Sequence, residues 1–177
     1  DPNTNTFLTD DYDGNIRSDL TPSDIGAHAG NFTLSKDTMA PTIVYTPLTN
    51  TATLSNREIT VTIIDNGGIP NSVSDPVRPR LYFRKNAGTC YSSASSLTSG
   101  DSRNGVYTFL FDYTSVSGVV PGDQIQYYVI AQDSNTNLSS SPLFAIASDV
   151  NTVATAPTTL NSYLISNPLD TILIVGS

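Results

Sequence analysis

The stretch Glu58-Ile59-Thr60-Val61-Thr62-Ile63-Ile64-Asp65 decides the fold class of this chain. Apolar and polar residues alternate along it, so Ile59, Val61 and Ile63 fall on one face of an extended strand. In a helix the same three residues would be spread around the axis. The stretch therefore predicts a β-strand with one buried face. The turn residues Asn66–Pro70 end it.

Similar segments occur on both sides of this strand. Each is short, rich in apolar, β-branched or aromatic residues, and bounded by Gly, Pro, Asn or Asp. The pattern predicts an all-β fold, an antiparallel sandwich of about seven strands. The further strands that we expect are Pro41–Pro47, Arg80–Arg84, Val106–Phe111, Gln124–Asp133 and Leu143–Ala147.

The composition changes twice along the chain. Residues 1–36 are rich in Asn, Asp and Thr, have no periodic apolar run, and are interpreted as an N-terminal extension. Residues 37–148 carry all the expected strands and form the sandwich. Residues 149–177 are predicted to be a linker and the start of a next region, because 151–159 are rich in Thr, Ala and Pro. The abrupt start at Asp1 indicates a piece of a longer protein.

The surface is polar but weakly charged. Charged residues make up 14 % of the chain, against about 25 % in typical globular proteins. Ser, Thr and Asn together supply 60 residues, which suits an extracellular or cell-surface β protein. The net charge of −8 argues against a nucleic-acid partner. No apolar stretch is long enough to insert into a membrane.

The chain is poorly supplied with groups that titrate near neutrality. It has one histidine, one cysteine and one glutamate, which are His28, Cys90 and Glu58. An active site needs a cluster of such groups, so we expect no enzyme. A lone cysteine also cannot form an intramolecular disulfide.

The stretch Asp123-Gln124-Ile125-Gln126-Tyr127-Tyr128-Val129 resembles the F strand of immunoglobulin-like and fibronectin III-like domains. Val129 occupies the position of the disulfide cysteine, as in disulfide-free members. The resemblance covers 37–148 and gives Asp123, Tyr127 and Val129 structural roles. It implies a tyrosine corner, in which the Tyr127 ring is buried and its hydroxyl bonds to nearby backbone.

A second resemblance lies near the N-terminus. Asp11–Arg17 and Asp24–Ala27 look like the closing motif of right-handed parallel β-helix domains in large secreted Bacteroidota proteins that use type IX secretion. His28 and Ala29 depart from that motif. Asn161–Ile165 resembles the lead-in to a further β-helix region. The resemblance implies a sandwich module flanked by the ends of β-helix regions.

Several oxygen-bearing side chains are expected at one pole of the sandwich. In immunoglobulin topology the start of the first strand, the B–C loop and the F–G loop lie at the same end. Calcium takes 6–8 oxygen ligands with loose geometry, so these loops could hold one ion. The alternative is that the side chains cap their own turns and point apart. The candidate ligands are Asp37, Asp65, Asp133, Asn135 and Asn137, with Asp75 also in the B–C loop.

Thr38 is a candidate glycosylation site. The triplet Asp37-Thr38-Met39 resembles the Asp-Thr-apolar acceptor used for O-glycans in Bacteroidota.

Two functions remain open from these features. The first is a structural spacer of a large surface protein, for instance an adhesin, whose partners are the neighbouring domains. The second is a glycan- or protein-binding accessory module of a secreted polysaccharide-degrading enzyme. Sugars stack on exposed aromatic rings, and the chain has no Trp, so an exposed coplanar tyrosine pair would favour the second function. The candidate rings are Tyr82, Tyr91 and Tyr107.

Overall fold

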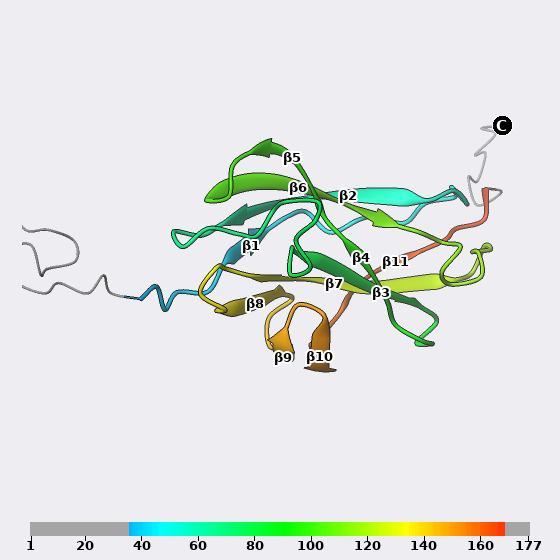
Figure 1. Cartoon of the computed structure of the whole chain (residues 1–177). Helices are drawn as coiled ribbons and strands as arrows, with labels where there is room; N and C mark the ends of the chain where they lie inside the picture. The colour runs from blue at the N-terminus through cyan, green and yellow to red at the C-terminus, as the bar shows by residue number, and fades with distance from the viewer. Residues whose placement is uncertain (1–35, 169–177) are drawn as a thin grey trace, which may run out of the picture. The chain divides into compact units, whose positions relative to one another are not determined.

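The computed structural model describes residues 36–168 and shows an all-β protein. Two antiparallel sheets face each other across a common core and form a β-sandwich (Figure 1). Between residues 36 and 168 there is no helix long and apolar enough to cross a bilayer. The predicted β-helix motif at residues 11–27 and the apolar run at 172–175 lie outside the described residues.

The first sheet has the strand order β1-β2-β6-β5. In β2 the residues Ile59, Val61 and Ile63 are at most 3 % exposed, which confirms the single buried face predicted from their alternation. Phe109 and Tyr107 of the neighbouring strand lie opposite Ile59 and Val61. The strands are β1 (Thr42–Val44), β2 (Arg57–Ile64), β6 (Asn104–Phe111) and β5 (Ser96–Gly100).

The second sheet is built around one long strand, β7 (Gln124–Gln132). Strand β3 pairs with one edge of β7 along residues 125–130. Since that edge is occupied, β11 and β8 share the other edge, where β11 pairs with residues 124–127 and β8 with residues 129–132. The remaining strands are β3 (Arg80–Lys85), β4 (Tyr91–Ala94), β8 (Leu138–Ser141) and β11 (Asn161–Leu164).

Aromatic rings fill the core between the sheets. The Phe111 ring of the first sheet meets Phe83, Tyr127 and Tyr163 of the second edge-on, with centroids 5.5, 5.2 and 5.7 Å away. Edge-to-face contacts of this kind add to the energy of area burial. Val129 is fully buried in the same core. The predicted inward position of Val129 is therefore confirmed.

A hairpin covers the outer face of the second sheet. It consists of β9 (Ile146–Asp149) and β10 (Thr152–Thr155), which lie below β7 and β3 in Figure 1. Tyr128 lies beneath the hairpin and is 2 % exposed, and Val150, in the turn between β9 and β10, is fully buried. The Tyr82 hydroxyl donates to the Val150 carbonyl at 2.9 Å. This second small core explains why β7 is buried on both of its faces.

The sandwich extends further along the chain than the sequence predicted. The prediction that all its strands lie within residues 37–148 is wrong, because β11 pairs with β7. This pairing brings Tyr163 and Ile165 into the core, where they are 2 % and 0 % exposed. The stretch 149–160 is part of the hairpin and its connection, not a free linker. Only one β11 side chain, Tyr163, is buried, so its sequence carries too short an alternation to be recognised.

The predicted strand boundaries differ in one further region. The prediction of a strand at Leu143–Ala147 is wrong, since β8 ends at Ser141 and β9 begins at Ile146. Phe144 between them has a positive φ of 78°, which is incompatible with an extended strand. Strands β4, β5 and β8 were not expected, because their Ser- and Thr-rich sequences lack apolar alternation. Within residues 36–168 the two sheets thus hold nine strands, where about seven were expected.

Tyr127 is buried as predicted but has a different partner. Its ring is 0 % exposed, and its phenolic oxygen accepts a hydrogen bond from the backbone N–H of Leu48 at 2.8 Å. Leu48 follows β1 and is far from β7 in sequence. The predicted tyrosine corner, in which the Tyr127 hydroxyl bonds to backbone close to it in sequence, is therefore wrong. The contact instead joins β7 to the segment between β1 and β2.

Asp123 has the structural role expected of it. Its carboxylate accepts hydrogen bonds from the Val120 N–H at 2.9 Å and the Asn86 side-chain amide at 2.6 Å. The Lys85 ammonium lies 3.8 Å away and pairs with the same carboxylate. Asp123 thus fixes the turn that enters β7.

Candidate metal centre

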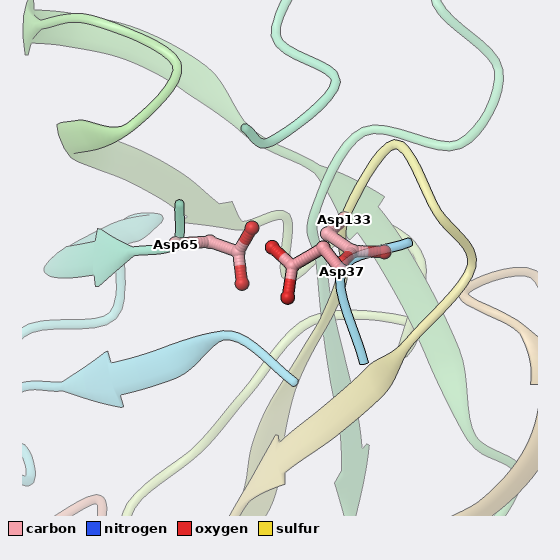
Figure 2. Close-up of side chains that lie close together, drawn as sticks. All are labelled: Asp37, Asp65 and Asp133. Atoms are coloured by element: carbon pink, nitrogen blue, oxygen red, sulfur yellow. The ribbon is translucent and has the colours of Figure 1, made fainter. Parts of the chain in front are cut away.

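Three aspartates converge at the pole where β2 and β7 end. Asp65 follows β2 directly, Asp133 follows β7 directly, and Asp37 precedes β1. Each offers one carboxylate oxygen to a group in which all three oxygens lie within 4.8 Å of one another. In Figure 2 the Asp65 side chain points toward the neighbouring side chains of Asp37 and Asp133. The approach of Asp65 to Asp133 within about 5 Å, expected for a shared cation, is therefore present in the structure.

Asp65 is held by the turn that follows β2. Its side chain is 5 % exposed, and its Oδ1 accepts hydrogen bonds from the backbone N–H groups of Gly67 and Gly68 at 2.7 and 3.0 Å. Burial raises the pKa of Asp65, and the negative charges of Asp133 and Asp37 raise it further, while the Gly67 N–H opposes them. The environment of Asp65 therefore penalises its negative charge.

Asp133 is the most deeply buried of the three, at 1 % exposure. Its Oδ1 accepts hydrogen bonds from the backbone N–H groups of Asn135 and Asn137, each at 2.8 Å. Its Oδ2 accepts one from the Asn137 side-chain nitrogen at 2.7 Å. That nitrogen also lies 2.9 Å from the Asp37 carbonyl oxygen, to which it donates. Asn137 thus ties Asp37 to Asp133 through its amide nitrogen.

Asp37 contributes an oxygen without a partner. Its Oδ1 accepts a hydrogen bond from the Met39 N–H at 2.9 Å. Its Oδ2 is fully buried, and no hydrogen bond to it exists among residues 36–168. A buried carboxylate oxygen in this condition has lost its hydration without gaining a substitute. It is the unsatisfied group of the cluster.

Gly67 leaves open the space into which these side chains point. A Cβ added to Gly67 would lie 2.8 Å from Asp37 Oδ2, 2.8 Å from the Asn135 side-chain nitrogen and 3.2 Å from Asp65 Oδ1. Asn135 therefore reaches the same space as the carboxylates. Its amide oxygen and nitrogen exchange places by a rotation of half a turn, which would present an oxygen there.

The charge of this cluster is not compensated by an ion pair in the part of the chain that the structure describes. None of the three carboxylates pairs there with a Lys, Arg or His, whereas Asp123 at the opposite pole pairs with Lys85. Carboxylates that share a site repel one another unless a proton or a cation lies between them. The arrangement is thus chemically suited to holding a positive ion.

Two other residues of this end lie apart from the cluster. Asp75 accepts a hydrogen bond from the Val77 N–H at 3.0 Å and so caps its own turn. This is the alternative to calcium binding that the sequence left open for all the candidate ligands. Thr38, the candidate glycosylation site, is exposed beside Asp37.

The tyrosines do not form the exposed pair that a sugar-binding surface would need. Tyr82 stacks on Tyr128 with centroids 5.2 Å apart and an interplanar angle of 6°, but Tyr128 is 2 % exposed beneath the hairpin. Tyr107 is fully buried, and Tyr91 is 38 % exposed without a stacked ring. Within residues 36–168 there is no exposed coplanar tyrosine pair.

Comparison with known proteins gives no relative from which a role could be transferred. No family model matches this chain, and no curated protein matches it either. The function is therefore inferred from the fold and from the acidic cluster.

Proposed function

We propose that this chain is a non-catalytic spacer module of a large extracellular or cell-surface protein. One relationship carries the proposal, namely that the chain enters and leaves the sandwich at opposite ends. Asp37, at the entry, lies against Asp133, which directly follows β7. Ile165, at the exit, donates from its N–H to the carbonyl of Asp123 at 2.8 Å, and Asp123 directly precedes β7.

The distance between entry and exit follows from the length of β7. The strand has nine residues, and strands rise about 3.3 Å per residue, so the two ends are separated by roughly 30 Å. Figure 1 shows the blue entry and the red exit at opposite ends of the sandwich. A module of this form adds length between its neighbours and does not fold the chain back on itself.

The last strand is anchored in a way that suits a connecting module. Beyond its pairing with β7, the Leu164 carbonyl accepts a hydrogen bond from the Thr51 N–H at 3.0 Å, and the Ser166 N–H donates to the Thr51 carbonyl at 2.7 Å. The Thr51 bonds form a parallel bridge, whereas the pairing of β11 with β7 is antiparallel, and the hydrogen bonds of an antiparallel ladder run perpendicular to the strands. A pull along the long axis therefore loads several bonds of the β11–β7 ladder at once.

The strand order supports an immunoglobulin-like assignment for the module. Constant-type immunoglobulin domains have the orders A-B-E-D and G-F-C. The orders β1-β2-β6-β5 and β11-β7-β3 correspond to these when β11 is taken as strand G. The long connection from β7 to β11 then carries β8 and the covering hairpin. Modules of this class occur in many cell-surface proteins.

The spacer role predicts a fixed distance between entry and exit. Spin labels on Met39→Cys and Leu164→Cys, in a Cys90→Ser background of the full chain, should give one narrow distance distribution near about 30 Å by pulsed electron paramagnetic resonance. Both positions are exposed, at 70 % and 40 %. A broad distribution, or one centred below about half that value, would contradict the role.

A binding screen separates the spacer from an accessory module. Affinity electrophoresis of the full chain through gels that contain soluble polysaccharides should show no retardation, because the stacked pair Tyr82 and Tyr128 is covered. Retardation by one polysaccharide that free oligosaccharide reverses would replace the spacer role with glycan binding.

A further inference from the structure

We propose that Asp37, Asp65 and Asp133 bind one calcium ion, and that this ion fastens the entry of the chain to both sheets of the sandwich. The site does not depend on the spacer role, since a calcium site would serve any module of this fold. Three features of the molecule support this calcium site: the Asp37 side chain, the hydrogen bonds around the three aspartates, and the type of the ligand atoms.

The Asp37 carboxylate distinguishes this cluster from an ordinary group of surface acids. Acidic side chains that gather on a wet surface need no ion, because water solvates each oxygen. Here Asp37 Oδ2 is fully buried and has no hydrogen-bond partner within residues 36–168. It points into the space beside Gly67 that the Asp65 Oδ1 and the Asn135 amide also border. A cation in this space would satisfy the one carboxylate oxygen that is buried without a hydrogen-bond partner among residues 36–168.

The second feature is how the other carboxylates are held. Backbone N–H groups of Gly67 and Gly68 fix Asp65, and those of Asn135 and Asn137 fix Asp133. These bonds are local, so they aim the two carboxylates before any ion arrives. The repulsion between the aimed charges is relieved when an ion binds. The cluster is therefore preorganised for a cation.

The third feature is the type of the ligand atoms. The candidate ligands are carboxylate oxygens, with the Asn135 amide beside them, and no His or Cys among residues 36–168 belongs to the cluster. Such ligands favour hard cations over zinc or copper. Oxygens on opposite sides of calcium lie roughly 4.6–5.2 Å apart, since each is about 2.3–2.6 Å from the ion. The oxygens here lie within 4.8 Å of one another, which fits this span.

Calcium is favoured over magnesium by the way the ligands are supplied. Magnesium demands nearly ideal octahedral geometry and usually keeps several waters, so few protein ligands suffice. Calcium accepts irregular sets from several loops. Three carboxylates from three separate segments, with Asn135 beside them and water completing the shell, form a set of that irregular kind.

The position of the site gives the ion a structural consequence. Asp65 follows a strand of the first sheet, Asp133 follows a strand of the second, and Asp37 begins the described fold just before β1. Since Asp65 and Asp133 lie directly after β2 and β7, one ion would join the exits of these two strands to the segment that precedes β1. We therefore expect calcium to protect the chain around Asp37 from proteolysis and to raise the melting temperature.

Binding is tested on the full chain after removal of divalent ions. Isothermal titration with calcium chloride should give one site per chain, and melting followed by circular dichroism should shift upward with calcium and return with chelator. Absence of binding heat together with an unchanged melting temperature would overturn the proposal. Magnesium that binds as tightly as calcium would overturn the choice of ion.

Two variants and a control locate the site. Asp37→Asn removes one charge, and Gly67→Ala keeps every ligand but fills the space with a methyl group. Both should weaken calcium binding at least tenfold. Asp75→Asn, which lies outside the cluster, should bind as the wild type does. Calcium binding that both Asp37→Asn and Gly67→Ala leave unchanged would place the ion elsewhere and overturn the proposal.

A further comparison guards against a variant that fails to fold. Without calcium, Asp37→Asn should melt at or above the wild-type temperature, because the repulsion among three carboxylates is reduced. With calcium, it should melt below the wild type. A lower melting temperature in both conditions would mean that Asp37 acts only as a structural cap, and would contradict the site.

Discussion

The backbone N–H of Leu48 donates a hydrogen bond to the phenolic oxygen of Tyr127 at 2.8 Å, across 79 positions of sequence. Leu48 follows β1 of the first sheet, and Tyr127 lies in β7 of the second. The Tyr127 ring is 0 % exposed and meets Phe111 edge-on. One side chain thus fills the core and holds the segment between β1 and β2 against β7.

Replacing Tyr127 by Phe should lower the free energy of unfolding by about 1–3 kcal/mol. The ring would still fill the core, but the Leu48 N–H would lose its acceptor in a part-buried position. Chemical denaturation of the two proteins measures the difference. Tyr91→Phe is the control, because Tyr91 is 38 % exposed and should change stability little. Equal denaturation midpoints for Tyr127→Phe and wild type would contradict the role of this bond.

The residues at the end of β11 test whether this strand belongs to the sandwich. Ile165 is fully buried and Leu164 is 40 % exposed, although they are neighbours. Ile165→Ala should cost about 2–5 kcal/mol of stability, the range for large-to-small changes in a core. Leu164→Ala should stay within about 1 kcal/mol. If both variants melted like the wild type, the sandwich would end before β11.

The covering hairpin should respond to a single hydroxyl. Tyr82 donates to the Val150 carbonyl at 2.9 Å and so connects the outer face of β3 to the turn between β9 and β10. Tyr82→Phe should speed amide exchange in β9 and β10 about fivefold, corresponding to about 1 kcal/mol. Exchange in β2 and β6 should not change. Acceleration across both sheets, or in neither place, would mean that this bond does not hold the hairpin.

Alkaline pH should weaken the fold through its buried phenols. Burial raises the pKa of Tyr45 to about 12 and that of Tyr107 to about 12, above the ordinary value of 10.0. Between these values the unfolded chain loses protons that the folded chain keeps, so stability falls as pH rises from about 10 through about 12. Denaturation midpoints measured across this range should decline. Tyr45→Phe should reduce the decline, and a midpoint that is constant to about pH 12 would contradict the assignment.

The strands with strong alternation could be predicted because their signal is local. In β2 each second residue is buried, and this pattern is visible without any partner strand. The shared pole of Asp37, Asp65 and Asp133 could also be predicted, since each lies next to a strand end and antiparallel connections bring those ends to one pole. Topology placed these three residues at one pole, but it left open whether their side chains converge or cap their own turns and point apart.

What only the tertiary structure decided depends on contacts between distant segments. Strand β11 is recognised by its pairing with β7, because one buried side chain leaves no periodicity. The Leu48 partner of Tyr127 and the unsatisfied oxygen of Asp37 have no mark in the sequence at all. The sequence by itself determined the strands whose buried face alternates strongly, such as β2, and the carboxylates that follow β2 and β7. Three-dimensional packing decided which groups are satisfied, since a hydrogen bond depends on positions that chain neighbours do not specify.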